Sequence, residues 1–275
     1  MKEANPIAAL STDRRPLKEY KAVKLSQPLY NVYERSLESA IPTEKLPQHV
    51  GVLMDGNRRW AAQIGESTKH GHEAGAQKVI DFLTWCHEVG VPMVTLYMLS
   101  TENLKRKPEE LGDLLEVIES LINKLAQAQV GRIHAVGQLK ALPDSLRETI
   151  GQATIDTAGV NELQVNIAVG YGGRQEIVDA VREVLRESAT SGKSLEELAD
   201  SLEAEDISRH LYTRGMPDPD LLIRTSGEQR LSGFLTWQSA YSEFYFCEAL
   251  WPDFRRVDFL RALRDFANRQ RRFGS

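Results

Sequence analysis

Cysteine and long hydrophobic runs are the features that this chain has least of. Its 275 residues include only two cysteines, Cys86 and Cys247, which stand alone and far apart. They offer no disulfide framework and no cysteine metal site, so we expect reduced core thiols in a cytoplasmic protein. No apolar run approaches the roughly 20 residues that span a bilayer. The first residues also lack the charged-then-apolar pattern of a signal peptide.

An excess of positive charge is missing as well. The chain carries 34 Lys and Arg residues against 39 Asp and Glu residues, which gives a formal net charge of −5. This balance argues against general nucleic-acid binding, and we expect at most a peripheral contact with a membrane. A content of 41% hydrophobic and 27% charged residues is typical of a globular protein. The length is enough for one large domain or two small ones.

Residues 1–44 are predicted to form an N-terminal extension, because they are mixed in charge and interrupted by prolines. One short amphipathic helix is expected within it, over residues 28–35. From residue 45 to residue 275, strand-like and helix-like segments alternate, which predicts one α/β domain with a central, mostly parallel β-sheet flanked by helices. The predicted strands are 50–54, 94–99, 132–136, 163–169 and 220–225. The predicted helices are 73–89, 108–129, 143–157, 173–189, 205–213 and 256–271.

Residues 49–60 carry the most informative pattern in the chain. The run 50–54 is short, uncharged and partly β-branched, as expected for a buried strand of a parallel sheet. Asp55 follows at the carboxyl end of that strand, where it is placed to hold a metal. Gly56 allows a sharp turn, and the N–H groups of residues 57–59 can open a helix. This combination suits a phosphorylated ligand with a divalent cation, although an ordinary strand–turn–helix corner with solvated arginines is an equally open alternative.

Other predicted strands also end in polar residues. Residues 100–106 follow the strand over 94–99, and residues 224–232 follow the strand over 220–223. Because the carboxyl ends of parallel strands lie at one edge of a sheet, Asp55, Asn103 and Arg224 are expected to meet there.

A second anion pocket is predicted from Arg224, Arg230 and Ser232. Guanidinium groups match phosphate oxygens, and a hydroxyl adds another donor. Any one of these arginines could instead be a surface side chain. Glu243 lies in the mostly aromatic and apolar segment 237–246, where a carboxylate is costly to bury unless it is paired. It is predicted either to pair with an arginine or to be a second carboxylate ligand for Mg²⁺.

With these segments in order, the chain resembles a family of enzymes. The matching motifs are residues 49–60, 100–106, 166–174, 220–232 and 237–254. Together they resemble the cis-prenyltransferases, the undecaprenyl diphosphate synthase or isoprenyl transferase family, over about residues 46–275. The paired DDxxD motifs of the helical trans-type prenyltransferases are absent from the sequence. The resemblance implies an α/β fold with an apolar tunnel.

The resemblance also implies a reaction. Isopentenyl diphosphate would be condensed with an allylic diphosphate, geranyl or farnesyl, to form a Z double bond and release diphosphate, with Mg²⁺ as the cofactor. Asp55 and Asn103 would have catalytic roles, and Asp55 and Glu243 would hold Mg²⁺. Substrate contacts would come from Gly56, Asn57, Arg58, Arg59, Trp60, His72, Ser100, Thr101, Glu102, Arg106, Arg224, Arg230, Leu231 and Ser232. Since an amide is not a base near neutral pH, Asn103 is expected to orient the substrate while a diphosphate oxygen or a relayed group takes the proton.

The sequence departs from the family pattern in the allylic pocket. Thr68 stands where many members have a basic residue, with Lys69 beside it. Leu104 replaces a common tryptophan, and Ser226 stands where glycine is frequent. These differences leave the Asp55 and Glu243 pair untouched.

Product length is predicted from Met98. Long-chain enzymes tend to have a small residue at this point, whereas methionine would narrow an apolar tunnel. We therefore expect a short product, (2Z,6E)-farnesyl diphosphate. A decaprenyl or undecaprenyl product is the alternative.

The resemblance further implies a homodimer, in which Arg272 of one chain could reach the isopentenyl diphosphate site of the other. A frayed basic tail is the alternative for this end of the sequence. Two other functions compete with the prenyltransferase hypothesis. A phosphotransferase with Asp55 as nucleophile usually has a second acid two positions later, where this chain has Asn57. A non-catalytic partner subunit usually lacks the first acid, which is present here.

Overall fold

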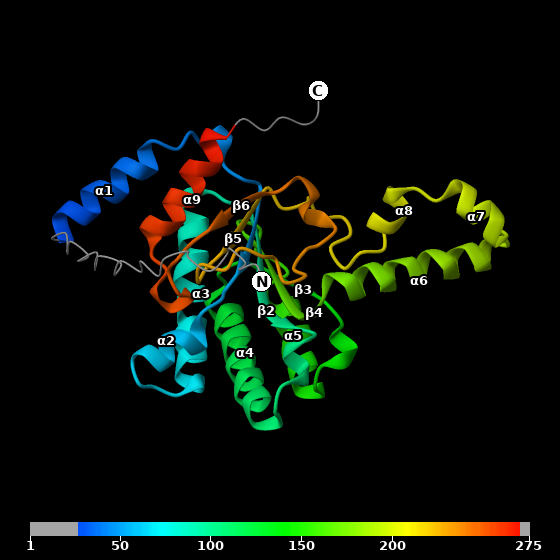
Figure 1. The fold of residues 1–275 in the computed structure, drawn as a ribbon, viewed down its shortest axis with the longest axis horizontal. Helices are drawn as coiled ribbons and strands as arrows, with labels where there is room; N and C mark the ends of the chain where they lie inside the picture. The colour runs from blue at the N-terminus through cyan, green and yellow to red at the C-terminus, as the bar shows by residue number, and fades with distance from the viewer. Residues whose placement is uncertain (1–26, 270–275) are drawn as a thin grey trace, which may run out of the picture.

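The computed structural model describes residues 27–269 of the chain, and over this range a parallel β-sheet lies at its centre (Figure 1). Within the described residues the sheet has six strands in the order β3-β4-β2-β1-β5-β6, and every adjacent pair is parallel. The strands are β1 (His49–Leu53), β2 (Met93–Ser100), β3 (Arg132–Val136), β4 (Gln164–Tyr171), β5 (Leu221–Arg224) and β6 (Glu243–Phe246).

Helices follow most of the strands. They are α1 (Gln27–Ser39), α2 (Asn57–Gln63), α3 (Thr68–Val89), α4 (Pro108–Ala128), α5 (Asp144–Asp156), α6 (Gly173–Ser191), α7 (Leu195–Ser201), α8 (Ala204–Ser208) and α9 (Arg256–Asn268). Pro108 begins α4, where its missing N–H costs no helical hydrogen bond. Gly90 and Gly192 end α3 and α6 in the left-handed conformation that glycine adopts most readily.

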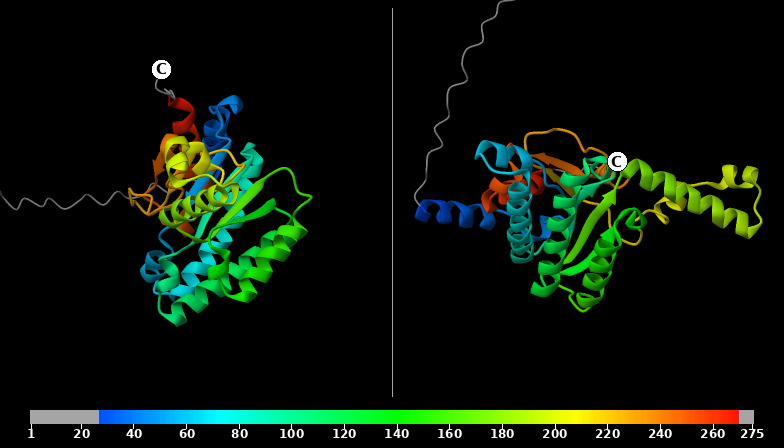
Figure 2. Two further views of the ribbon diagram at one scale, coloured as in Figure 1. Left: turned by 90° about the vertical axis from the view of Figure 1, so that its right-hand side faces the viewer. Right: turned by 90° about the horizontal axis from the view of Figure 1, so that it is seen from below.

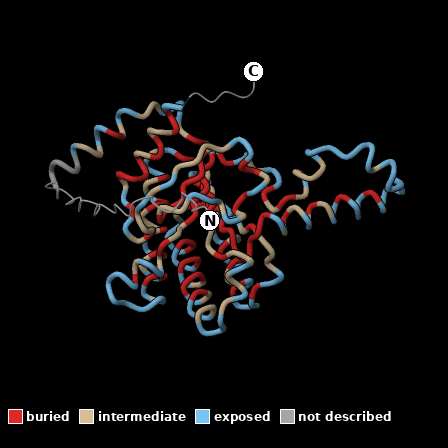
Figure 3. Tube along the Cα trace, in the orientation of Figure 1, coloured by how far each residue is buried: buried red, intermediate tan, exposed pale blue. Residues whose placement is uncertain are grey.

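One face of the sheet carries the main hydrophobic core. Buried side chains of α3, α4, α5 and α9 pack there against the strands. In α4 the buried residues recur every three or four positions, from Leu114 through Ile118 and Leu121 to Leu125, as a helix with one apolar face requires. A smaller cluster around Tyr171, Leu222 and Phe234 covers the opposite face. Figure 3 shows the buried segments concentrated near the centre of the molecule, with exposed segments mostly at its periphery.

The chain order of the strands places a crevice beside β1. From β1 the chain moves to β2, then to β3 at the edge and back to β4, which lies between them, and it forms β5 and then β6 on the other side of β1. The boundary between β1 and β5 is therefore a topological switch point. In open parallel sheets, ligands bind beyond the carboxyl ends of the strands at such a point.

Helices α6, α7 and α8 form an arm that projects away from the sheet (Figures 1 and 2). Four large apolar side chains on or beside the arm are exposed: Val178, Leu185, Leu195 and Leu202. At the other side of the molecule, α1 packs on α9 through Leu37, Val257 and Leu260.

The structure confirms the predicted fold class and the five predicted strands to within two residues at their ends. The predicted helix over 205–213 is too long, because α8 ends at Ser208 and turns follow. Strand β6 and helix α7 were not predicted. The predicted helix in the N-terminal extension is longer than expected and runs from Gln27 to Ser39. The domain boundary at residue 44 stays a prediction. Over residues 27–269, no helix is long and apolar enough to cross a membrane.

Candidate active site

A cavity of about 1310 Å³ opens at the carboxyl ends of the strands, at the switch point between β1 and β5. Most of the site residues predicted from the sequence line it. These are Asp55, Gly56, Asn57, Arg58, Arg59, His72, Met98, Ser100, Thr101, Glu102, Asn103, Arg106, Arg224, Arg230, Leu231 and Ser232.

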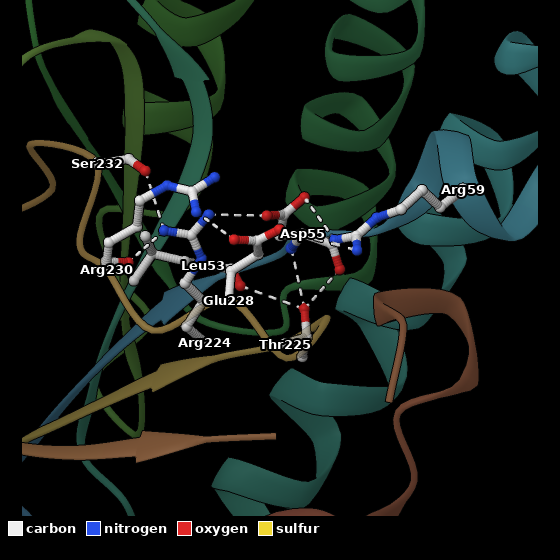
Figure 4. A network of polar contacts seen from close by, with 8 residues as sticks. All are labelled: Leu53, Asp55, Arg59, Arg224, Thr225, Glu228, Arg230 and Ser232. Atoms are coloured by element: carbon white, nitrogen blue, oxygen red, sulfur yellow. Dashed lines mark hydrogen bonds and ion pairs between the residues drawn. The ribbon is translucent and has the colours of Figure 1, made fainter. Parts of the chain in front are cut away.

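Asp55 is fixed by the last residue of β5 and the residue after it (Figure 4). Arg224 Nη2 donates to Asp55 Oδ2 at 2.8 Å, which joins the ends of the two strands beside the switch point. The Thr225 hydroxyl accepts from the Asp55 backbone N–H at 2.9 Å and donates to the Asp55 carbonyl at 2.7 Å. Both the side chain and the backbone of Asp55 are therefore held by residues at the carboxyl end of β5.

The electrostatic surroundings keep Asp55 ionised. Partial burial by itself would raise the pKa of Asp55, but the hydrogen bond and the charge of Arg224 outweigh it. Ser226 and Arg59 add to the effect, so the pKa of Asp55 lies below its ordinary value. An ionised carboxylate facing a cavity is a ligand type that Mg²⁺ accepts.

Arginines from β5 and the loop after it form the second anion pocket that the sequence predicted. Arg224 Nη1 donates to Ser232 Oγ at 2.9 Å and to the Arg230 carbonyl. Arg224 is buried, whereas Arg230 reaches the cavity from a more exposed position. Glu228 pairs with Arg230 and lies 3.9 Å from Arg59, so a carboxylate spans two arginines beside the cavity.

A second carboxylate spans the arginines on the other side of the cavity. Glu110, in the first turn of α4, lies 3.1 Å from both Arg58 Nη1 and Arg106 Nη1. His72 lies close to this cluster and is buried. Burial, together with the charges of Arg106 and Arg58, lowers the pKa of His72 to about 4. His72 is therefore neutral near pH 7.

Two glycines, one in the turn between β1 and α2 and one in α3, shape this side of the cavity. Gly56 has φ +113°, a conformation that other residues rarely adopt, and a Cβ there would meet Leu250 at 2.8 Å. Across the turn, Gly75 of α3 lies so close to Asn57 that a Cβ would meet its Oδ1 at 2.5 Å. Small residues thus let α2 and α3 pack tightly and bring Asn57 to the cavity wall.

Ser100 and Asn103 form a closed turn at the end of β2. The Ser100 N–H donates to Asn103 Oδ1 at 3.0 Å, and the Asn103 N–H donates to Ser100 Oγ at 3.1 Å. This reciprocal pair fixes the carboxamide of Asn103 at the cavity.

Apolar side chains complete the cavity wall. Val79 of α3, Met98 of β2 and several residues of α4 line it, and those of α4 are Leu114, Val117, Ile118 and Leu121. The register of β2 against β4 shifts between Tyr97 and Leu99, which is a bulge at Met98. Tyr97 packs in the smaller cluster, whereas Met98 and Leu99 both contact the main core. The bulge therefore directs Met98 toward the helices α3 and α4.

Three predicted site residues lie outside the cavity wall or outside the described residues. Glu243 begins β6 opposite Leu221, at the amino end of the strands, and pairs with Arg269. Within one chain, Glu243 and Asp55 therefore lie at opposite ends of the strands, and the role of Glu243 as a Mg²⁺ ligand stays a prediction. Its ion pair with Arg269 matches the alternative in which it pairs with an arginine. Trp60 does not line the cavity, since its Nε1 donates to Asp253 at 2.9 Å and its ring stacks on His70. Arg272 lies outside the described residues.

Several residues of the site were not predicted. Glu110 and Glu228 gave no signal in the sequence, because acids are common in first helical turns and in polar loops. Thr225 and Gly173 could have been found as direct neighbours of predicted strand ends. Lys69, which stands beside the family's usual basic position, pairs with Glu116 at 2.7 Å and does not line the cavity.

A parallel α/β sheet with an acid and several arginines around a partly apolar cavity defines a class of enzyme that can bind a diphosphate attached to a hydrocarbon. The chain belongs to the undecaprenyl diphosphate synthase family of prenyltransferases, because the family described as "Putative undecaprenyl diphosphate synthase" matches residues 53–274.

Curated relatives and solved structures agree with this assignment. The chain is 58% identical over 248 residues to a (2Z,6E)-farnesyl diphosphate synthase of Thermobifida fusca, covering 90% of this chain and 97% of the relative. It is 50% identical over 255 residues to a (2Z,6E)-farnesyl diphosphate synthase of Mycobacterium tuberculosis, covering 91% of this chain and 97% of the relative. The crystal structure of lavandulyl diphosphate synthase from Lavandula x intermedia with dimethylallyl diphosphate superposes with a TM-score of 0.79 and 32% identity. That match covers 84% of this chain and 100% of the lavender chain.

Proposed function

We propose that this protein condenses isopentenyl diphosphate with a short allylic diphosphate to give a Z-prenyl diphosphate, with (2Z,6E)-farnesyl diphosphate as the product. The observation that carries the proposal is the bond between Asp55 and Arg224 at the mouth of a cavity with apolar walls. This hydrogen bond joins Asp55, a carboxylate that can bind a metal, to Arg224, a guanidinium that can bind an anion. Both line a cavity with space for a hydrocarbon chain. The names of the Thermobifida and Mycobacterium relatives support the product.

In this proposal the two substrates occupy two groups of residues. The allylic diphosphate binds beside Gly56, Asn57, Arg58, Arg59, His72 and Arg106. Isopentenyl diphosphate binds to Arg224, Arg230, Leu231 and Ser232. Guanidinium groups suit both because they donate two parallel hydrogen bonds to phosphate oxygens. The carboxylates Glu110 and Glu228 pair with these arginines and would give way as the diphosphates bind.

Mg²⁺ is the proposed cofactor, and Asp55 suits it. Among the described residues, no group of three or more His, Cys, Asp or Glu side chains could hold a metal ion. This is compatible with Mg²⁺, which commonly uses one or two carboxylates together with phosphate oxygens and water. When bound, Mg²⁺ neutralises the charge that develops on the departing diphosphate. Arg58, Arg59 and Arg106 contribute to the same stabilisation from the protein side.

The bonds that break and form in the condensation suggest an orienting role for Asn103. The allylic C–O bond breaks, a C–C bond forms with the terminal carbon of isopentenyl diphosphate, and a proton leaves its C2 carbon. Asn103 cannot accept that proton near neutral pH, so a diphosphate oxygen takes it. Ser100, Thr101, Glu102 and Asn103 orient the substrate for this step from the end of β2.

The proposal includes a homodimer in the cytoplasm, with Arg272 contributing to the neighbouring site. The exposed apolar side chains Val178, Leu185, Leu195 and Leu202 of the arm support association with a second copy, because monomers rarely leave such surfaces uncovered.

Three alternatives are separated by one experiment. Purified protein is incubated with Mg²⁺, labelled isopentenyl diphosphate and geranyl diphosphate, with Asp55→Ala alongside. A C15 Z-product from the wild type that falls by about 10²-fold or more in the variant supports the proposal. Decaprenyl or longer products would establish a long-chain enzyme. Absence of any product would favour a non-catalytic partner subunit.

A further inference from the structure

Arg174 is an arginine of the main cavity that has no role in the reaction described above. It lines that cavity from the start of α6 and is exposed. Its side chain makes no ion pair and no hydrogen bond with any residue in the part of the chain that the structure describes. The other arginines that line the cavity each have a carboxylate within 4.0 Å, and they are Arg58, Arg59, Arg106, Arg224 and Arg230. Arg174 is therefore a cation of the cavity wall that is available to an anionic ligand.

The backbone beneath Arg174 is held against the loop that follows β5. The Gly173 N–H donates to the Gly233 carbonyl at 2.9 Å. A Cβ on Gly173 would meet Thr236 Oγ1 at 2.4 Å, so a residue without a side chain is needed for this close approach. The start of α6 is therefore fixed beside the loop over residues 230–236, and the side chain of Arg174 extends from that fixed point.

The acid two positions later in α6 does not neutralise Arg174. Glu176 is buried, and it accepts hydrogen bonds from the Tyr212 N–H at 2.9 Å and from Gln238 Nε2 at 3.1 Å. Residues two positions apart do not face each other on a helix, so Glu176 and Arg174 point in different directions. The partial positive charge of the helix start adds to the charge of the guanidinium.

The anion pocket beside this loop has little net positive charge without Arg174. Asp55 and Glu228 offset most of the charge of Arg59, Arg224 and Arg230. A diphosphate carries several negative charges, so a further guanidinium on this side of the cavity strengthens its binding.

We propose that Arg174 binds the diphosphate group of isopentenyl diphosphate, as a third arginine beside Arg224 and Arg230. This inference rests on the proposed function, because it takes the loop over residues 230–236 as part of the isopentenyl diphosphate site. The allylic diphosphate binds beside α2 and α3 in that proposal. A change at Arg174 should therefore affect the binding of one substrate and leave that of the other nearly unaltered.

The test separates the charge of Arg174 from its bulk. Arg174→Gln removes the charge and keeps a polar side chain, whereas Arg174→Lys keeps the charge. Arg147→Gln is the matched control, because Arg147 is also an exposed arginine near the start of a helix but lies on α5, outside the cavity wall. Calorimetry measures the Kd of each protein for isopentenyl diphosphate with Mg²⁺. Steady-state kinetics measures kcat and the KM for isopentenyl and geranyl diphosphate, and the Tm is recorded for each protein.

Arg174→Gln is expected to raise the Kd and the KM for isopentenyl diphosphate by about 10-fold or more, because a hydrogen bond between charged groups is lost. The KM for geranyl diphosphate and the Tm should change little. Arg174→Lys should show a smaller rise, since lysine has the charge but lacks the planar donor fork. Arg147→Gln should match the wild type.

An Arg174→Gln variant that binds isopentenyl diphosphate as tightly as the wild type would overturn the inference. A rise confined to the KM for geranyl diphosphate would overturn it as well. Either result, with product formed by the wild type, leaves the proposed function standing. A wild-type protein that forms no product and binds no isopentenyl diphosphate would sink the proposed function together with the inference.

Discussion

Met98 lies at a bulge of β2, in the wall of the cavity and against the main core. Replacing it with alanine would open apolar space beside Val79 and Ile118. We expect Met98→Ala to make longer products than the wild type, because the growing chain can extend past this point. Reversed-phase chromatography of the labelled products measures the change.

Leu99 provides the control for Met98. It is fully buried on the same side of the bulge but does not line the cavity. Leu99→Ala should cost about 2–5 kcal/mol of stability and leave the product length unchanged. Unaltered products from Met98→Ala would remove Met98 as the residue that limits chain length.

His72 should make the protein sensitive to acid. Its folded pKa of about 4 lies below the ordinary value of 6.5, so the unfolded state binds the proton more readily. Stability should therefore fall as the pH drops from 6.5 towards 4. His72→Gln should remove a loss on the order of 2 kcal/mol between pH 7 and pH 5, as measured by urea unfolding at both values.

The control is His87→Gln, at the exposed end of the same helix. If wild type and His72→Gln lose the same stability between the two pH values, the neutral, buried state of His72 is refuted.

At the residue scale, the sequence predicted best the positions of residues that directly follow a strand. Asp55 and Arg224 are 169 positions apart, yet their contact was predictable. Each follows a short apolar run that predicts a strand, and parallel strands end at one edge of the sheet. The position of Glu243 at the amino end of the strands was not predictable, because the strand that it begins was not recognised in the sequence. The roles of Glu110 and Glu228 were not predictable either. No local sequence pattern distinguishes an acid that pairs with arginines of the site from an acid exposed to solvent.

At the scale of the secondary-structure elements, the close contact between α2 and α3 determines the position of the Asn57 side chain. Gly75→Ala would place a methyl group against the Asn57 side chain, which must then move. We expect the KM for the allylic diphosphate to rise by about 10-fold, because a displacement of about 1 Å in a substrate-positioning group can cost that much or more. Steady-state kinetics with geranyl diphosphate measures the effect.

Gly112→Ala on α4 is the matched control, since a Cβ there would meet nothing within 4 Å. It should be neutral or slightly stabilising, because alanine favours a helix over glycine. Equal kinetics for the two variants would show that the position of Asn57 does not matter for binding.

Element boundaries were predictable where a long apolar period met a glycine or a proline, as at the end of α3 before Gly90 and at the start of α4 at Pro108. The bulge in β2 could not be predicted, because the sequence of one strand does not show where its register against the neighbouring strand shifts. The four residues of β6 were too few for a pattern, and its strand conformation depends on pairing with β5.

At the scale of the whole molecule, the arm is expected to join two copies. Val178 and Leu185 are seven residues apart on α6, so they lie on one helix face, and both are exposed. Leu185→Glu should place a charge in the interface and shift the protein toward monomers, as measured by sedimentation velocity.

Ile155→Glu serves as the control, because Ile155 is also apolar and exposed but lies on α5, away from the arm. It should leave the assembly unchanged. A wild-type protein that sediments as a monomer at micromolar concentration would contradict the dimer.

The strand order also has a consequence during synthesis. A ribosome completes β1 to β4 long before β5 emerges, so β1, which is central and fully buried in the finished sheet, is at first an unpaired edge. Exposed, uncharged edges of this kind invite pairing with other chains. When β5 forms, it covers that edge, and it also brings Arg224 and Thr225 to Asp55, which lacks these hydrogen-bond partners until then.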